Sequence, residues 1–239
     1  SSVFAPKVNL LVQKNPQNLN QLLTDLFITV GRIQWFILFL IFSGFIFFGQ
    51  YFMYLWVGDG YQNSYYIALI LMAPEIVPLI QNVGIEIQRA KNKHQIRSIV
   101  YFIVAILNVL ISIFLAYFYG EVGCAIGTAI SLILGPIIFM NIYYHNKLKI
   151  NMKQFWISIL KTLPGILLPV LYGVFILLFH KFVSIADFLI MIIVYSCIYI
   201  ISIYKLSLNK SEKEYFSYLF SFLRKRRKSN DDKKNIENF

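Results

Sequence analysis

Residues 33–56 of the chain read IQWFILFLIFSGFIFFGQYFMYLW and contain no Asp, Glu, Lys or Arg. A helix needs about 20 apolar residues to cross a hydrocarbon core of roughly 30 Å. The apolar run is continuous rather than alternating, which argues against a strand of a membrane β-barrel. This stretch therefore predicts a membrane-spanning helix.

Five more apolar stretches of this kind lie near residues 65–87, 98–119, 122–144, 162–179 and 185–204. Only 14% of the 239 residues are charged and 58% are hydrophobic, whereas a soluble domain carries roughly 25% charged residues. We expect an all-α polytopic membrane protein with six full transmembrane helices in residues 1–206 and a basic tail in residues 207–239. Residues 1–13 (SSVFAPKVNLLVQ) predict the end of a seventh helix, so we interpret the chain as a fragment of a longer, transporter-like protein.

The basic residues predict how the helices cross the membrane. Of the 22 Lys and Arg residues, all except Lys181 fall in four segments, which are residues 7–32, 89–97, 147–161 and the tail from residue 205. The intervening loops are short and carry the acidic residues Asp59, Glu121 and Asp187. Cytoplasmic loops carry an excess of Lys and Arg. We therefore expect the basic loops and the C-terminal tail to lie in the cytoplasm.

Two basic segments allow more than one interpretation. The run RKRRK at residues 224–228 favours contact with anionic membrane lipids over nucleic-acid binding, and the polar residues after it are expected to be disordered. Residues 150–159 (INMKQFWISI) predict either a short interfacial helix or the irregular start of the fifth span.

The sequence offers little catalytic chemistry. Cys124 and Cys197 lie in separate spans without metal-ligand spacing, and the three histidines are isolated at predicted helix ends. The outer loops are too short to hold a polar donor and acceptor. We therefore expect neither an enzyme nor a metal or cofactor site, and the polar residues inside the spans become the site candidates because they are costly in lipid.

The second span contains the stretch ALILMAPEIVPLIQNVG at residues 68–84. Because a helix turns about 100° per residue, Asn82 and Glu86 return to the face of Glu75, and Arg89 lies slightly off that face. This pattern predicts a substrate cavity that opens toward the cytoplasm and ends near Glu75. A structural ion pair between Glu75 and another part of the protein would give the same pattern.

Two prolines and two isoleucines complete the prediction for this span. Pro74 and Pro78 each lack a backbone donor and are expected to kink the helix, as at broken helices that line transporter sites. Ile80 and Ile87 are expected to face lipid.

The third span carries a weaker polar face around Asn108 and Ser112. We consider these two residues as cavity candidates, although hydrogen bonding between helices is the favoured interpretation. In the fourth span, Gly123, Gly127 and Ser131 are spaced four apart, which predicts close helix packing.

Four stretches together resemble a known family: FAPKVNLL at residues 4–11, FFGQYFMYLWVGDGYQNSYYIALILMAPEIVPLIQN at 47–82, QRAKNKHQIRSIVYFIVAILNVLISI at 88–113 and GEVGCAIGTAIS at 120–131. The ordered set is similar to the C-terminal half of Wzx-like polysaccharide-unit flippases, which are members of the MATE-like (MOP) transporter superfamily. The resemblance covers roughly residues 1–150 and the last two spans less clearly.

The resemblance implies two six-helix lobes that face each other across a central cavity and work by alternating access. It implies a flippase of the bacterial plasma membrane that carries an undecaprenyl-diphosphate-linked oligosaccharide from the inner to the outer leaflet for O-antigen or capsule synthesis. The chain would supply the last four helices of the C-terminal lobe and two further spans. Its partners would be the missing N-terminal lobe, membrane lipids, and a polysaccharide polymerase and chain-length proteins, without nucleic acid.

Two alternatives remain open from the sequence. A MATE-like, cation-coupled multidrug exporter would share this architecture, because substrate class is not fixed by fold. A non-transporting membrane scaffold of a polysaccharide assembly complex would also be built almost entirely of spans.

Overall fold

The computed structural model describes residues 4–14, 16–58, 60, 62–209 and 212–213. Every regular element in these residues is a helix, as the sequence predicts. In chain order the elements are α1 (Ala5–Lys14), α2 (Leu19–Val57), α3 (Gln62–Ile80), α4 (Val83–Ala90), α5 (Gln95–Leu132), the π-helix η2 (Ile133–Phe139), α6 (Met140–Asn146), α7 (Met152–Leu160), α8 (Leu163–Phe179) and α9 (Ile185–Leu206).

Several of these helices are suited to a membrane. Four segments are long and apolar enough to cross one, namely Leu19–Val57, Asn63–Ile80, Gln95–Asn146 and Ile185–Leu206. A fifth is obtained if α7 and α8, which meet at 45°, form one bent span. These lengths fit a helical membrane protein with several spans. The count of six stays a prediction, because it requires Gln95–Asn146 to cross twice.

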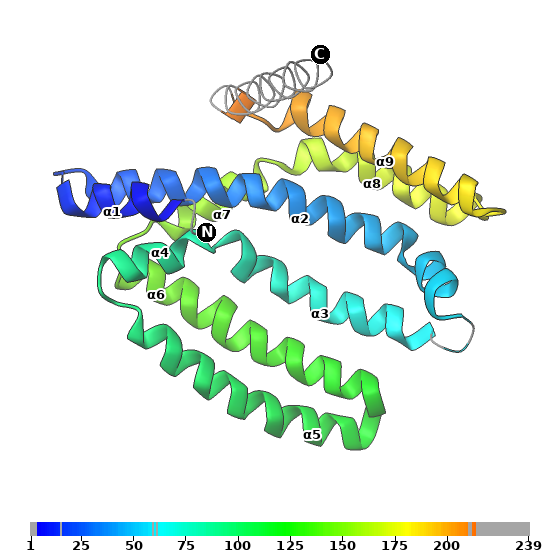
Figure 1. Cartoon of the computed structure of the whole chain (residues 1–239), viewed down its shortest axis with the longest axis horizontal. Helices are drawn as coiled ribbons and strands as arrows, with labels where there is room; N and C mark the ends of the chain where they lie inside the picture. Colours follow the sequence, from blue (N-terminus) through cyan, green and yellow to red (C-terminus); the bar gives the residue numbers. More distant parts are fainter. Residues whose placement is uncertain (1–3, 15, 59, 61, 210–211, 214–239) are drawn as a thin grey trace, which may run out of the picture.

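The segment Gln95–Asn146 doubles back on itself as a hairpin (Figure 1), and the residue inside α5 with non-helical backbone angles is Gly120. Gly120 has φ 59° and ψ −138°, a conformation that glycine adopts without the steric cost of a side chain. The two arms of this hairpin pack very closely, since a Cβ added to Gly127 would lie 2.6 Å from Ser112 Oγ. The close packing predicted around Gly123 and Gly127 is therefore confirmed.

The connections between helices gather at two ends of the bundle. The α2–α3, α5 and α8–α9 turns lie at one end, and the α4–α5 and α6–α7 loops lie at the other (Figure 1). At this second, basic end, the Lys91 ammonium group donates to the carbonyl oxygen of Leu148 at 2.9 Å. Partial burial, and secondly the charge of Lys93, lower the pKa of Lys91. Which end faces the cytoplasm stays a prediction.

The largest apolar core lies at the basic end, where α1 packs against α4, and α2 packs against both α4 and α7. Phe27 belongs to this core, and the centroid of its ring lies 4.9 Å from that of Phe155 and 5.7 Å from that of Tyr144. Leu23 and Ile87 are also fully buried here. The expectation that Ile87, together with Ile80, faces lipid is therefore wrong, because both side chains belong to this core.

Residues 7–32 form a packed part of this end rather than a basic loop before the first span. α1 occupies Ala5–Lys14, and α2 begins at Leu19 and continues for 39 residues. At 1.5 Å per residue, α2 is about 58 Å long, roughly twice the thickness of the hydrocarbon core. α2 is therefore longer than a single perpendicular crossing requires, and its buried residues from Leu23 to Val30 belong to this apolar core.

The predicted segments after residue 150 correspond to α7, α8, α9 and the start of the tail. Residues 152–160 form the helix α7, which meets α8 at 45° and can be the first part of one bent span, so both interpretations of residues 150–159 stay predictions. Asn151 begins this helix by accepting the Gln154 N–H at 3.1 Å. The fifth and sixth predicted stretches correspond to α8 and α9. Of the tail, residues 207–209 and 212–213 are described, and the run RKRRK lies outside the described residues.

Candidate functional site

An open groove of about 290 Å³ lies between α2 and α3. Its described lining is apolar apart from Glu75, and consists of Leu38, Ile41, Phe42, Leu71, Met72, Glu75, Ile76 and Leu79. Glu75 is exposed, and none of the ion pairs between described residues involves it. A carboxylate in such surroundings is costly in lipid unless a cation, a proton or hydrogen-bond donors reach it. Glu75 is therefore a candidate site residue whose side chain is available to a ligand.

The other residues of the predicted stripe do not share the environment of Glu75. Asn82 lies at the interruption between α3 and α4 and is half-buried. The Glu86 carboxylate is buried and accepts a hydrogen bond from Arg89 Nη1 at 3.3 Å, while the Arg89 side chain is exposed. The predicted stripe requires one continuous helix, and the break between α3 and α4 separates its two halves. The prediction of one wet face running from Glu75 to Arg89 is therefore wrong.

The interruption of this span lies beyond the prolines. α3 continues through Pro74 and Pro78 and ends at Ile80, so residues 65–87 are not one helix. Each proline removes a helical donor and weakens the helix near it. At the break, the Gly84 N–H bonds to the carbonyl of Gln81 at 2.8 Å, which leaves the carbonyl of Ile80 without its usual helical partner.

The side-chain amide of Gln34, on α2, approaches the backbone at this break. With its side-chain amide oriented to donate, Gln34 lies 3.1 Å from the carbonyl oxygen of Leu79 and 3.3 Å from that of Ile80. Gly31 permits this approach, because a Cβ there would lie 2.9 Å from the Ile80 carbonyl oxygen. The break is thus held by a neighbouring helix, as the free backbone groups of a broken membrane helix require.

A second group of hydrogen bonds joins the break after α3 to the fourth predicted span. Gln81 is buried, and its Nε2 donates to Asn141 Oδ1 at 3.1 Å. Trp156 Nε1 donates to the same oxygen at 2.8 Å. The π-helix η2, which contains Pro136, packs against α3 and leads directly into the helix that carries Asn141. π-Helical segments within α-helices are frequent at functional sites, so η2 is the second feature of the candidate site.

Asn108 and Ser112 are brought together, but in a different place. Asn108 Oδ1 accepts hydrogen bonds from Ser112 Oγ at 2.8 Å and from Thr128 Oγ1 at 3.1 Å. Ser112 is buried, and both residues lie at the contact between the two arms of the Gly120 hairpin. Their geometry is the hydrogen bonding between helices that the sequence analysis favours, and neither residue lines the groove beside Glu75.

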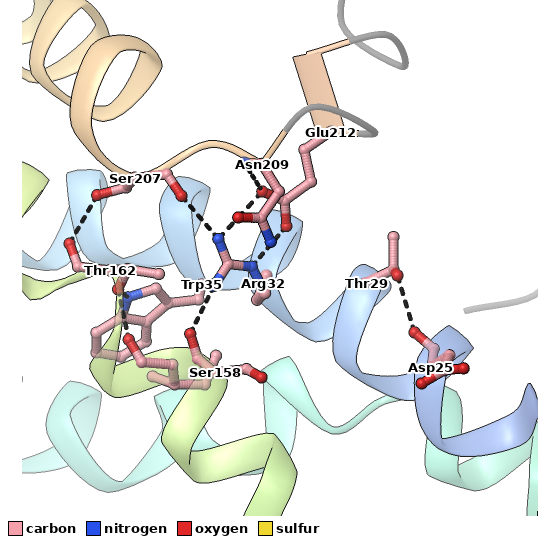
Figure 2. Close-up of polar contacts among 10 residues, drawn as sticks. Asp25, Thr29, Arg32, Trp35, Ser158, Thr162, Ser207, Asn209 and Glu212 are labelled. Carbon is pink, nitrogen blue, oxygen red and sulfur yellow. Dashed lines mark hydrogen bonds and ion pairs between the residues drawn. The ribbon is translucent and has the colours of Figure 1, made fainter. Parts of the chain in front are cut away.

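Sequence reasoning missed a buried cluster around Arg32 (Figure 2). The Arg32 guanidinium pairs with the Glu212 carboxylate, and its Nη2 lies 3.1 Å from Glu212 Oε2. It also donates to the carbonyl oxygens of Ser158 at 2.6 Å and Ser207 at 2.8 Å. Both charged side chains are buried, with relative exposures of 4% and 3%. Because the donors and acceptors here are matched, the cluster joins α2, α7 and the end of α9 rather than offering a ligand site.

The site has few reactive groups among the residues that the structure describes. No cluster of three His, Cys, Asp or Glu side chains there could hold a metal ion, and Cys124 and Cys197 are unpaired thiols on separate helices. The chemistry that the groove offers is therefore binding through one carboxylate and an apolar wall. Comparison with family models, with curated proteins and with solved structures finds no match to this chain.

Proposed function

We propose that the chain forms one wall of a membrane transporter, as part of a flippase for an undecaprenyl-diphosphate-linked oligosaccharide. The observation that carries the proposal is the Glu75 carboxylate, which stands in an open apolar groove between α2 and α3. The oligosaccharide and the direction of transport come from the resemblance of the sequence to Wzx-like flippases. The six-span arrangement and the cytoplasmic basic end belong to the same proposal.

The chemistry of such a substrate is compatible with the groove. A lipid-linked sugar has hydroxyl groups that cannot enter hydrocarbon without hydrogen-bond partners and an apolar chain that can remain there. A carboxylate accepts hydrogen bonds from several hydroxyl groups. We assign Glu75 to contact with sugar hydroxyls, and the apolar wall to the lipid chain. The described lining of the groove has no Lys or Arg, so we assign the diphosphate to a second lobe.

The break between α3 and α4 supports a moving part next to this groove. Pro78 weakens the end of α3, while Gln34 and Gln81 hold the interruption by hydrogen bonds that can be exchanged for others. We assign this break the role of a hinge during alternating access, since broken helices recur at transporter sites.

The test uses the native gene and two substitutions. Deletion is expected to leave undecaprenyl-linked units on the inner leaflet, and Glu75→Gln is expected to reproduce this accumulation at normal protein level. Glu121→Gln, at an exposed turn residue, is the matched control and should transport normally. Normal transport by Glu75→Gln would refute the assignment of this residue. Deletion without accumulation would refute the flippase and favour the scaffold.

One observation also favours a second candidate function. A single carboxylate in an otherwise apolar groove suits a lipophilic organic cation, which a multidrug exporter would carry. The test is efflux of tetraphenylphosphonium from cells that express the native gene. Efflux that is lost in Glu75→Gln, with unchanged handling of undecaprenyl-linked units, would select the exporter. Absence of efflux would exclude it.

A further inference from the structure

A separate pocket of about 390 Å³ lies at the turn end of the bundle, opposite the basic end. It is formed by the last turns of α2, the start of α3 and the connection between α8 and α9. We call it the turn-end pocket and define it by Tyr51, Tyr54, Tyr65, His180, Lys181 and Phe182. Its size is in the range of pockets that hold small organic ligands.

Aromatic rings make the walls of the turn-end pocket firm. The rings of Tyr51 and Phe182 have centroids 4.9 Å apart, and the ring of Phe48 lies 6.0 Å from that of Phe182. The Tyr65 hydroxyl donates to the carbonyl oxygen of Ile46 at 2.7 Å. These contacts join α2 to both α3 and the α8–α9 turn. The pocket is therefore part of the packed structure and not a gap beside a loose loop.

The rim of the pocket is polar and cationic. His180 Nε2 lies 2.9 Å from Asp187 Oδ2, which fixes the imidazole ring at the edge. Lys181 is exposed next to it and is the one basic residue that the sequence places in an outer turn. Gln50 adds an exposed amide, and no carboxylate is among the described residues that line the pocket.

Apolar surface continues from the pocket along α8. Leu177 lines the pocket and is 50% exposed, while the neighbouring Leu178 and Phe179 are 70% and 74% exposed. A cationic rim at the end of an apolar helix lies at the depth where lipid headgroups meet their chains. The pocket thus presents a cation and hydrogen-bonding groups to a headgroup, and an apolar helix face to its chains.

We propose that the turn-end pocket binds an anionic phospholipid, with its phosphate at Lys181 and Gln50 and its chains along α8. Tyrosine faces and hydroxyls at the pocket wall would contact the glycerol part of the headgroup. The site is distinct from the Glu75 groove, and the proposal holds whether or not the chain belongs to a flippase.

The experiment measures retained lipid on the full chain in detergent by native mass spectrometry, after incubation with phosphatidylglycerol or with phosphatidylcholine. The variant is Lys181→Gln, and because the Lys181 side chain is exposed, this substitution is expected to leave the fold intact. The matched control is Lys153→Gln, an exposed lysine on α7 at the basic end. Loss of one cation at an anionic lipid surface predicts about a fivefold weaker retention of phosphatidylglycerol for Lys181→Gln. Lys153→Gln should change it much less.

Three outcomes would overturn the proposal. The first is equal retention of phosphatidylglycerol by the parent protein and Lys181→Gln, and the second is an equal loss in both lysine variants. The third is displacement of the lipid by free glycerol phosphate at the same concentration as by phosphatidylglycerol, since the chains would then contribute nothing. Preferential retention of phosphatidylglycerol over phosphatidylcholine, reduced only by Lys181→Gln, supports it.

Discussion

The buried pair between Arg32 and Glu212 allows a quantitative prediction. The Arg32 guanidinium is 4% exposed beside Glu212, and Glu212→Ala would remove its countercharge. Breaking a buried ion pair from one side costs about 3–5 kcal/mol. The carbonyl oxygens of Ser158 and Ser207 still accept from the guanidinium in the variant. We therefore expect the lower end of that range, about 3 kcal/mol.

Thermal unfolding of the full chain in detergent measures this effect. For a chain of this size, 1 kcal/mol corresponds to a change in Tm of about 2–4 °C, so Glu212→Ala should lower Tm by roughly 6–12 °C. Glu121→Ala is the matched control, because Glu121 is exposed and accepts one hydrogen bond from Asn63 at 3.0 Å. It should lower Tm by less than about 2 °C, as surface substitutions usually do.

A double variant separates loss of the pair from loss of packing. Arg32→Met with Glu212→Leu removes both charges and keeps similar side-chain volume, and such replacements of buried pairs are often neutral. The double variant should therefore recover most of the Tm that Glu212→Ala loses. A Tm for Glu212→Ala equal to that of Glu121→Ala would show that the pair is not buried in solution and would refute the reasoning.

The other predictions concern packing, the groove and the topology. Gly127→Val should lower Tm by several degrees because its side chain would meet Ser112, while Gly44→Val should not, since nothing lies within 4 Å of a Cβ there. Cys substituted for Glu75 should react quickly with a water-soluble thiol reagent when the folded protein is held in detergent. Cys substituted for Ile87 should react hardly at all, because Ile87 is buried. Equal rates would contradict the burial described above. Reporters inserted in the α4–α5 loop and in the α8–α9 turn should report opposite sides of the membrane. Reporters on the same side would contradict the predicted topology.

The spans could be predicted from the sequence because lipid imposes a simple requirement. A helix in hydrocarbon needs about 20 apolar residues whatever its neighbours are, so the 22-residue helix α9 follows from composition alone. The hairpin at Gly120 could also be predicted, because Gly-Glu interrupts an apolar run and glycine accepts the φ of 59° that the turn requires.

The candidate site could be predicted only in part. Glu75 stands out because a carboxylate between two prolines is unusual in a span, and its exposure in a groove agrees with a ligand role. The exact break could not be found, since it depends on contacts with distant residues such as the approach of Tyr144 to Gly84. Arg32 and Glu212 are 180 residues apart, and no local pattern connects them.

The packed basic end could have been predicted from the spacing of apolar residues at the start of α2. Leu23, Leu26, Phe27 and Val30 are buried on one face of α2, and their spacing of three and four residues is the pattern of an amphipathic helix. A search for long apolar runs passes over this pattern, because polar residues such as Asp25 interrupt it. The apolar core at this end is larger than the two other apolar clusters of the described residues. It is therefore this end that fixes α2, α4 and α7 relative to one another, and the break beside Glu75 lies at its edge.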